Sequence, residues 1–364
     1  MSSLRLSPAL IGLAFSLCLP SELHAAREVT KTIRTELPEA PAGEFAVENL
    51  AGHMRVTAGS GTALVVVATI HAESQALADA VRVEKTVKGD ATTLRVAYPP
   101  DVRTIRYPES SGENSWPASF LFSSGGAYSY GGRTVRVSSN RGPIIFVDLD
   151  VQVPARGSRA RFLNLVGRLD AEGIEGHLRF EVSSADLRLE RLGGDVDLHG
   201  ESGDLRASDI SGRFASDSSS GDIRMDGFRG ESLSLRTSSG DGELSGVAAD
   251  RVRVHTSSGD FQFLDADIGE LDAESSSGNI ELDERGSRLK RVTVEASSGD
   301  VGVRLPRDAA FDAQAEQGSG DMEVGFSDGA ARRRGDEIAG YRRGNGGATI
   351  HVKTTSGNLR IDPR

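Results

Sequence analysis

Carboxylates recur at a regular spacing in this 364-residue chain, where they could bind a metal ion or take part in catalysis. An aspartate or asparagine follows a glycine in a repeated phrase that reads SSSGD, TSSGD, ASSGD or a close variant. The eight pairs are Gly203 and Asp204, Gly221 and Asp222, Gly240 and Asp241, Gly259 and Asp260, Gly278 and Asn279, Gly299 and Asp300, Gly320 and Asp321, and Gly357 and Asn358. Aligned carboxylates could bind Ca²⁺, which takes about six to eight oxygen ligands, and two carboxylates about 5 Å apart could form a retaining glycosidase site.

The spacing of the phrase indicates the elements that hold these residues. Successive glycines are 18, 19, 19, 19, 21, 21 and 37 residues apart. Apolar residues alternate with polar ones on both sides of each phrase, as in Val252 and Val254 before Gly259 and Phe261 and Phe263 after it, which is typical of short strands with one buried face. The sequence therefore predicts an all-β fold, a single-stranded β-solenoid (β-helix) with about 18–21 residues per turn and loop insertions. An antiparallel sandwich is the competing interpretation, but it would not keep one phase through eight repeats.

In a solenoid the eight glycine pairs become structural corners. Glycine permits positive φ, and short polar side chains satisfy backbone groups that a sharp turn leaves unpaired. Stacking alone places neighbouring aspartates about 5 Å apart, so that spacing is no evidence for a glycosidase. We therefore predict no catalytic, cofactor-binding or metal-ligating residue and no enzyme, with a polysaccharide-processing β-helix enzyme and a calcium-stabilised binding module as alternatives. The other metal-binding candidates are interpreted as solvent-facing strand residues, and they are His53, His71, His177, His199, His255 and His351.

The first 26 residues predict export. They contain Arg5, an apolar run from Leu10 to Leu19, and small residues at Ala25 and Ala26, which together are typical of a secretory signal peptide. The single cysteine of the chain lies in this segment, so the mature protein would have no disulfide or thiol. No later run approaches the ~20 apolar residues of a membrane helix, and a net charge of -11 disfavours nucleic-acid binding. We expect a periplasmic or secreted protein.

The repeat also predicts the organisation of the mature chain, residues 27–364, as one solenoid domain. Its expected parts are 27–105 as N-terminal turns and cap, 106–142 as a Ser/Gly/aromatic insertion loop, 143–326 as regular turns, 327–347 as an Arg/Gly-rich loop and 348–364 as the final turn. The last strand, NLRIDPR, ends with charges and a proline, which disfavour edge-to-edge pairing. A monomer is therefore expected.

The two interruptions of the repeat hold the candidate contact surface. Aromatic residues gather in the first, and arginines surround a tyrosine in the second. The candidates are Tyr107, Trp116, Phe120, Phe122, Tyr128 and Tyr130 in the first, and Arg332, Arg333, Arg334, Tyr341, Arg342 and Arg343 in or beside the second. Tyr and Trp suit contacts with a protein or glycan, and guanidinium groups pair with phosphate. The alternatives are that the rings fold back onto the solenoid and that the arginines form a solvated charge run.

Several segments resemble the DUF4097 family of adhesin-like β-solenoid domains, which occur in exported or envelope-associated bacterial proteins. They are AVENLAGHMRV, VQVPARG, the SSGD and SSGN phrases, VRLPRDAAFDAQ and TIHVKTTSGNLRI. The resemblance covers essentially the whole mature chain and implies a solenoid without catalytic residues. It implies a non-enzymatic adhesin-like or scaffold protein of the bacterial cell envelope, which acts through surface-displayed loops on an envelope protein or glycan.

Overall fold

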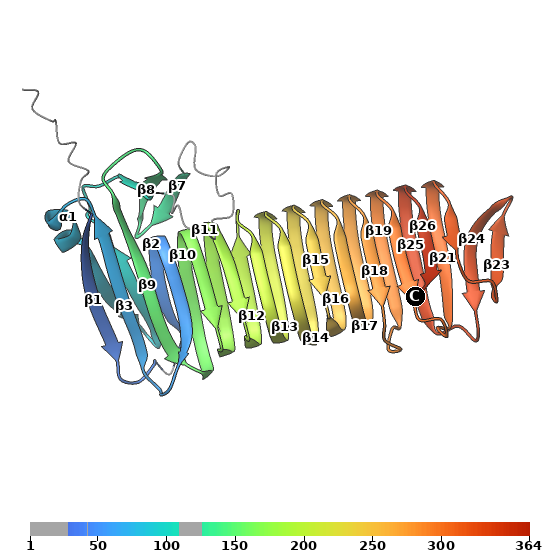
Figure 1. Ribbon diagram of the computed structural model, residues 1–364, viewed down its shortest axis with the longest axis horizontal. Coiled ribbons are helices and arrows are strands. Elements are labelled where there is room, and N and C mark those ends of the chain that lie inside the picture. The colour runs from blue at the N-terminus through green and yellow to red at the C-terminus, as the bar shows by residue number, and fades with distance from the viewer. Residues whose placement is uncertain (1–27, 42, 109–125) are drawn as a thin grey trace, which may run out of the picture.

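The computed structural model describes residues 28–41, 43–108 and 126–364 of the chain. These residues form a long rod built almost entirely of strands (Figure 1). The predicted signal peptide lies outside the described residues, as do Trp116, Phe120 and Phe122.

The body of the rod is the predicted β-solenoid. Its strands pair in parallel with the strand one turn later, at an offset equal to the sequence repeat, as in Leu205 with Ile223 and Phe261 with Ile280. The strands are β10 (Arg156–Glu172), β11 (Glu175–Glu190), β12 (Gly193–Gly200), β13 (Leu205–Ser220), β14 (Ile223–Ser239), β15 (Gly242–Ser245), β16 (Ala248–Ser258), β17 (Phe261–Ser277), β18 (Ile280–Glu284), β19 (Arg291–Ser298) and β20 (Val301–Leu305). The all-β fold class is confirmed.

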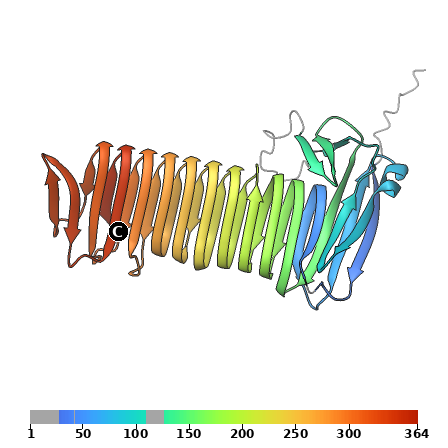
Figure 2. The ribbon, with the colours of Figure 1, turned by 180° about the vertical axis from the view of Figure 1, so that it is seen from behind.

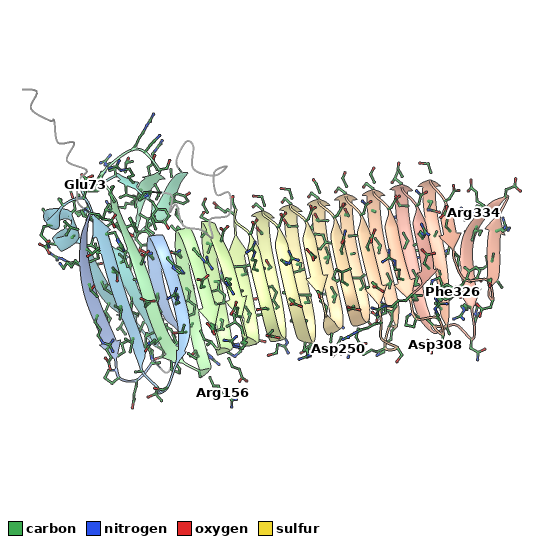
Figure 3. All side chains as sticks on the ribbon, in the orientation of Figure 1. Glu73, Arg156, Asp250, Asp308, Phe326 and Arg334 are labelled. Atoms are coloured by element: carbon green, nitrogen blue, oxygen red, sulfur yellow. The ribbon has the colours of Figure 1, made fainter. Side chains whose placement is uncertain are left out.

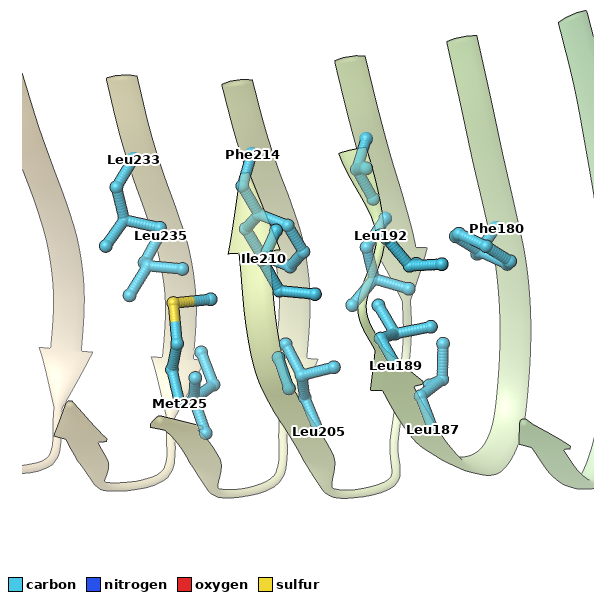
Figure 4. Packing of buried hydrophobic residues seen from close by; sticks show 14 of the residues in the cluster. Phe180, Leu187, Leu189, Leu192, Leu205, Ile210, Phe214, Met225, Leu233 and Leu235 are labelled. Atoms are coloured by element: carbon cyan, nitrogen blue, oxygen red, sulfur yellow. The ribbon is translucent and has the colours of Figure 1, made fainter. Parts of the chain in front are cut away.

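Alternating side chains of every turn point into one continuous apolar core. Leu205, Ile210 and Phe214 of one turn lie beside Leu187, Leu189 and Leu192 of the turn before it (Figure 4). A turn of this length cannot enclose its own apolar face, so each turn buries the face of its neighbours. The core therefore runs along the rod.

The N-terminal end of the rod is closed by antiparallel strands around one solenoid turn. That turn is β2 (Phe45–Gly59), whose first half pairs with β5 (Ala91–Ala97) and whose second half pairs with β9 (Ile145–Pro154). Antiparallel strands extend both faces: β4 (Arg82–Lys88) pairs with β5, β3 (Leu64–Ala72) pairs with β9, and β1 (Val29–Leu37) pairs with β3. The short helix α1 (Gln75–Ala80) lies beside β1 and β3.

The first interruption of the repeat contributes a small separate sheet. Its strands are β6 (Thr104–Arg106), β7 (Gly126–Tyr130) and β8 (Arg133–Ser138), with β8 between the other two. This sheet lies at the N-terminal end of the rod (Figure 1).

The last turn in the sequence is not the last turn in space. Its strands β25 (Ala348–Ser356) and β26 (Leu359–Pro363) pair on one side with β19 and β20. On the other side they pair with β21 (Phe311–Ser319) and β22 (Met322–Val324), which precede them in the chain. The expectation that the final strand ends the rod and guards it against pairing is therefore wrong. The phase of this turn matches both neighbours, so the repeat alone could not order them.

The second interruption forms the C-terminal tip. β24 (Glu337–Arg343) pairs antiparallel with β21, and β23 (Ala330–Arg334) pairs antiparallel with β24. Views from both sides show this hairpin beyond the last turn of the rod (Figures 1 and 2).

The inserted position of the last turn predicts a large cost for truncating its core. Ile350 is fully buried between two turns, as is Ile280 in the middle of the rod. Ile350→Ala and Ile280→Ala should each lower the free energy of unfolding by about 2–5 kcal/mol, measured by urea denaturation. If Ile350→Ala lowered the free energy of unfolding by less than about 0.5 kcal/mol, as a substitution at an exposed site does, the position of the last turn between two other turns would be contradicted.

Candidate functional site

The regularly spaced aspartates form a hydrogen-bond ladder along one corner of the rod. The side-chain oxygen Oδ1 of each residue accepts a hydrogen bond from the backbone N–H of its counterpart on the next turn. Asp204, for example, accepts from Asp222 at 3.0 Å, and Asp241 accepts from Asp260 at 2.9 Å. In space the ladder runs through Asp186, Asp204, Asp222, Asp241, Asp260, Asn279, Asp300, Asn358 and Asp321. Asparagine serves as well as aspartate, because only one acceptor oxygen is needed.

The glycine of each phrase is required by the same corner. Gly240 has φ +126, and a Cβ atom there would lie 2.2 Å from the carbonyl oxygen of Gly221 on the preceding turn. Side chains rarely adopt this conformation, and the stacked backbone leaves no room for one. The glycines therefore let successive turns approach closely enough to pair.

The hydroxyl that opens the TSSGD phrase is also structural. Thr237 and Thr256 are buried, and each donates to the carbonyl oxygen two residues later, at 3.0 and 3.1 Å respectively. Threonine, glycine and aspartate thus each satisfy a backbone requirement of the corner. In the described part of the chain, no group of three or more His, Cys, Asp or Glu side chains is arranged to hold a metal ion.

The described aromatic candidates of the first interruption cover the flank of the first turns. Tyr130 is only 5% exposed, and its hydroxyl donates to the carbonyl oxygens of Glu48 and Val96 at 3.0 and 2.7 Å. Tyr107 packs edge-on against Phe146, and burial raises the pKa of Tyr107 to about 12. Tyr130 therefore belongs to the core and not to a contact surface, since hydrogen bonds anchor its hydroxyl inside the rod.

Tyr128 keeps part of its ring accessible. Its hydroxyl donates to Ser184 Oγ at 3.0 Å, which ties the small sheet to the solenoid. Half-burial raises the pKa of this hydroxyl. Only part of the Tyr128 ring remains for contact with a partner.

Tyr341 and Arg343 hold the C-terminal hairpin onto the end of the core. Tyr341 is 6% exposed, stacks on Phe311 at 6.0 Å, and donates to the carbonyl oxygen of Phe326 at 2.7 Å. Arg343 lies 4.8 Å from the centre of the Phe326 ring and makes two hydrogen bonds to Asp328, at 2.6 and 2.8 Å. That pairing lowers the pKa of the Asp328 carboxyl. The sequence placed both residues on a contact surface, whereas the structure uses them to close the core.

Three other arginines of the hairpin form no ion pair with a described acidic side chain, although Arg342 lies opposite Asp312 in the pairing of β21 with β24. Arg332 is engaged, since it pairs with Asp312 at 2.5 Å and lowers the pKa of that carboxyl. Arg333 and Arg342 reach only backbone carbonyl oxygens, of Asp336 and Asn345, and Arg334 makes no ion pair with any described residue. All three side chains are exposed, and Arg334 lies at the C-terminal end (Figure 3). We call Arg333, Arg334 and Arg342 the tip arginines.

A surface groove of about 810 Å³ lies beside Arg334 of the hairpin. Arg334 and Lys353 line it together with the outward carboxylates of Glu274, Glu295 and Glu316. Lys353 lies between Glu295 and Glu316 on the face of the last turns, so only Arg334 of the two basic side chains comes from the hairpin.

Glu284 is a buried carboxyl that the sequence analysis missed. It is fully buried, accepts hydrogen bonds from the backbone N–H groups of Ile268 at 3.1 Å and Gly286 at 2.8 Å, and has its pKa raised to about 7 by burial. The segment after Glu284 lengthens this repeat to 21 residues and interrupts the backbone pairing between turns. The Glu284 carboxyl accepts hydrogen bonds from N–H groups at that interruption. That longer step is the one sequence signal that could have drawn attention to it.

Two histidines near the N-terminal end are more engaged than expected. His71 lies between Glu28 at 2.5 Å and Asp148 at 3.2 Å, and the hydrogen bond to Asp148 is the largest of the effects that raise its pKa. His53 pairs with Asp170 at 2.8 Å. Both rings join neighbouring strands instead of facing solvent freely.

A family model described as Toastrack DUF4097 matches residues 176–362, which is more than half of the chain. The chain belongs to this family. The resemblance recognised in the sequence is therefore confirmed, with the match covering residues 176–362. A comparison with curated proteins found no match. In the described residues, no helix is long and apolar enough to cross a membrane.

Solved structures of similar overall extent have low sequence identity to this Toastrack protein. One is a Parabacteroides distasonis protein whose name proposes lipid binding, with 13% identity, a TM-score of 0.37 and coverage of 91% of this chain and 96% of that chain. Two others have names that propose adhesins. The Parabacteroides merdae protein has 8% identity and a TM-score of 0.35, and the match covers 91% of this chain and 95% of that chain. The Bacteroides fragilis protein has 11% identity and a TM-score of 0.32, and the match covers 92% of this chain and 97% of that chain. The family assignment rests on the family match.

The corner geometry predicts unequal effects of three substitutions. Gly240→Ala should destabilise the protein by on the order of 3 kcal/mol, because it adds backbone strain and a collision with a carbonyl oxygen. Asp241→Ala should cost about 1 kcal/mol by removing the acceptor for Asp260, whereas Asp241→Asn keeps an acceptor and should be nearly neutral. Urea denaturation with and without millimolar CaCl₂ measures these differences. A calcium-dependent midpoint that Asp241→Asn abolishes would contradict the structural role.

Glu284 predicts a pH-dependent contribution to stability. The folded protein holds the Glu284 proton more tightly than the unfolded chain, so this contribution is complete below about pH 4.5 and is lost as the pH rises to about 7. Glu284→Gln should flatten the fall in melting temperature over this interval. Glu281→Gln, an exposed neighbour on β18, is the matched control and should leave the slope unchanged. The same slope in wild type and Glu284→Gln would show that Glu284 does not carry it.

Proposed function

We propose that this Toastrack protein is a non-enzymatic, adhesin-like or scaffold protein of the bacterial envelope, exported by its N-terminal signal peptide to the periplasm or the exterior. The observation that carries the proposal is the contrast between the repeat and its C-terminal interruption. The repeated aspartates bind backbone N–H groups of the next turn, while the exposed tip arginines form no ion pair among the described residues. A partner could neutralise those cations without disturbing the rod.

The mechanism is geometric. The small sheet β6–β8–β7 lies at one end of the rod and the β23–β24 hairpin at the other (Figure 1). Roughly ten turns at about 4.8 Å each separate them by on the order of 50 Å. A rigid body of this length can hold two contact regions apart, and the partner at either region would be an envelope protein or glycan.

The enzyme alternative gains no support from the ladder. A retaining glycosidase needs one carboxylate free to attack the sugar and another to donate a proton. In the ladder, each of the paired carboxylates uses an oxygen to accept a backbone hydrogen bond, and their regular spacing follows from stacking.

Envelope pull-down and glycan-array binding with purified mature protein test the proposed contact regions. One variant replaces residues 109–125 with a short Gly-Ser linker, which spares the anchored Tyr107 and Tyr130. The other carries Arg333→Gln, Arg334→Gln and Arg342→Gln, which leaves Arg343 and Tyr341 in place to close the core. We expect at least one variant to lose the bound component, with an unchanged melting temperature. If both variants bound like the intact protein, the contact role of the interruptions would be refuted.

A further inference from the structure

The outermost strand at the C-terminal tip has an unpaired edge. β23 pairs with β24 along its length and with no other described strand. All five residues of β23 are exposed. The N–H and C=O groups that do not face β24 therefore remain available on the outer side, which is the usual template for adding a strand from another chain.

The charge of this edge distinguishes it from the edges at the other end. The edge strands β1 and β4 contain glutamate as well as lysine and arginine, whereas β23 reads AARRR. Residues 327–347 contain five arginines and three acidic residues, a net charge of +2 in a chain of -11. The cations of the tip are thus concentrated on and beside one free strand.

The same charges select the partner of the edge. Parallel pairing of β23 with β23 of a second copy would set three arginines against three arginines, and antiparallel pairing would set Arg332 against Arg332 and gather six arginines on two strands. Like charges on neighbouring strands are destabilising. A strand rich in Asp or Glu would instead place carboxylates beside Arg333 and Arg334, where charge-assisted hydrogen bonds can form. The edge therefore disfavours self-association and favours an acidic strand.

The groove beside the hairpin restricts where such a strand can lie. The pairing of β24 with β21 stops at Gln314 and Gly340, and the outward carboxylates of Glu295 and Glu316 line the groove beyond that point. Lys353 lies between Glu295 and Glu316 in the strand register, so the lining of the groove has mixed charge, with the three carboxylates of Glu274, Glu295 and Glu316 against the two cations of Lys353 and Arg334. The charged residues of β23 are all arginines, so its outer edge is the more favourable position for an acidic strand.

We infer that β23 is a docking edge for an extended acidic segment of a partner protein, which adds to the sheet as a strand antiparallel or parallel to β23. Main-chain hydrogen bonds would supply affinity, and Arg333 and Arg334 would supply the preference for acidic residues. This inference rests on the proposed contact role of the tip and names the class of partner for it.

Two labelled peptides with the same charge test the inference on the full mature chain. EVEVEV can pair as a strand, whereas EPEPEP has the same carboxylates but lacks half of the backbone N–H donors. We expect EVEVEV to bind roughly tenfold or more tightly than EPEPEP by fluorescence polarisation, and to protect the amides of residues 330–334 from hydrogen exchange. Equal binding of both peptides, or no protection of these amides, would overturn strand addition in favour of capture of any anionic polymer.

Variants separate the edge from general electrostatics. Arg333→Gln with Arg334→Gln should weaken EVEVEV binding roughly tenfold, because two charge-assisted contacts are lost. Arg253→Gln with Arg304→Gln removes two exposed arginines elsewhere on the rod and should leave the affinity unchanged. Equal loss in both double variants would overturn the inference. If the tip variant loses its envelope partner while EVEVEV does not bind, strand addition is wrong and the contact role of the tip stands.

Discussion

At the glycine corners of the rod, a backbone carbonyl of one turn lies where a Cβ atom of the next turn would otherwise be. Gly240 over Gly221 is one instance, and the side-chain oxygen of Asp241 completes the corner by accepting the N–H of Asp260. The parallel pairing of the strands, and with it the continuous core, depends on this close approach. At Gly240, a residue with a side chain would separate the two turns and expose the apolar face of both.

The sequence predicted these corners because they repeat. The SSGD phrases recur at nearly the same spacing, which indicates that the turns stack. Apolar residues at every second position, such as Phe261 and Phe263, indicate which side of each strand is buried. A second column of glycines, Gly176, Gly194, Gly212 and Gly230, recurs every 18 residues and makes the same close approach at another corner. These glycines are less conspicuous in the sequence than those of the SSGD phrase, because the residues around them do not repeat.

The order of the last turns and the role of the tip could not be predicted in this way. The turn built from β25 and β26 fits the phase of both its neighbours, so periodicity contains no information on which side it stacks. The local composition suggested that Tyr130 and Tyr341 are contact residues. Their hydroxyls are instead held inside the rod by carbonyl oxygens that lie far from them in the sequence, such as that of Phe326 for Tyr341. Glu284 is similar, because its two donors become adjacent only after the turns stack.

Three features define the rod: turns stack through their corners, the last turn of the sequence is inserted among them, and the outer strand of the tip is left free. Hydrogen exchange along the whole mature chain, followed by mass spectrometry, tests all three parts at once. We predict that amides of β25 and β26 exchange as slowly as those of β19 and β20, while amides of β23 exchange fastest among the strands of the C-terminal end. Rapid exchange throughout β25 and β26, at the rate of β23, would contradict this prediction.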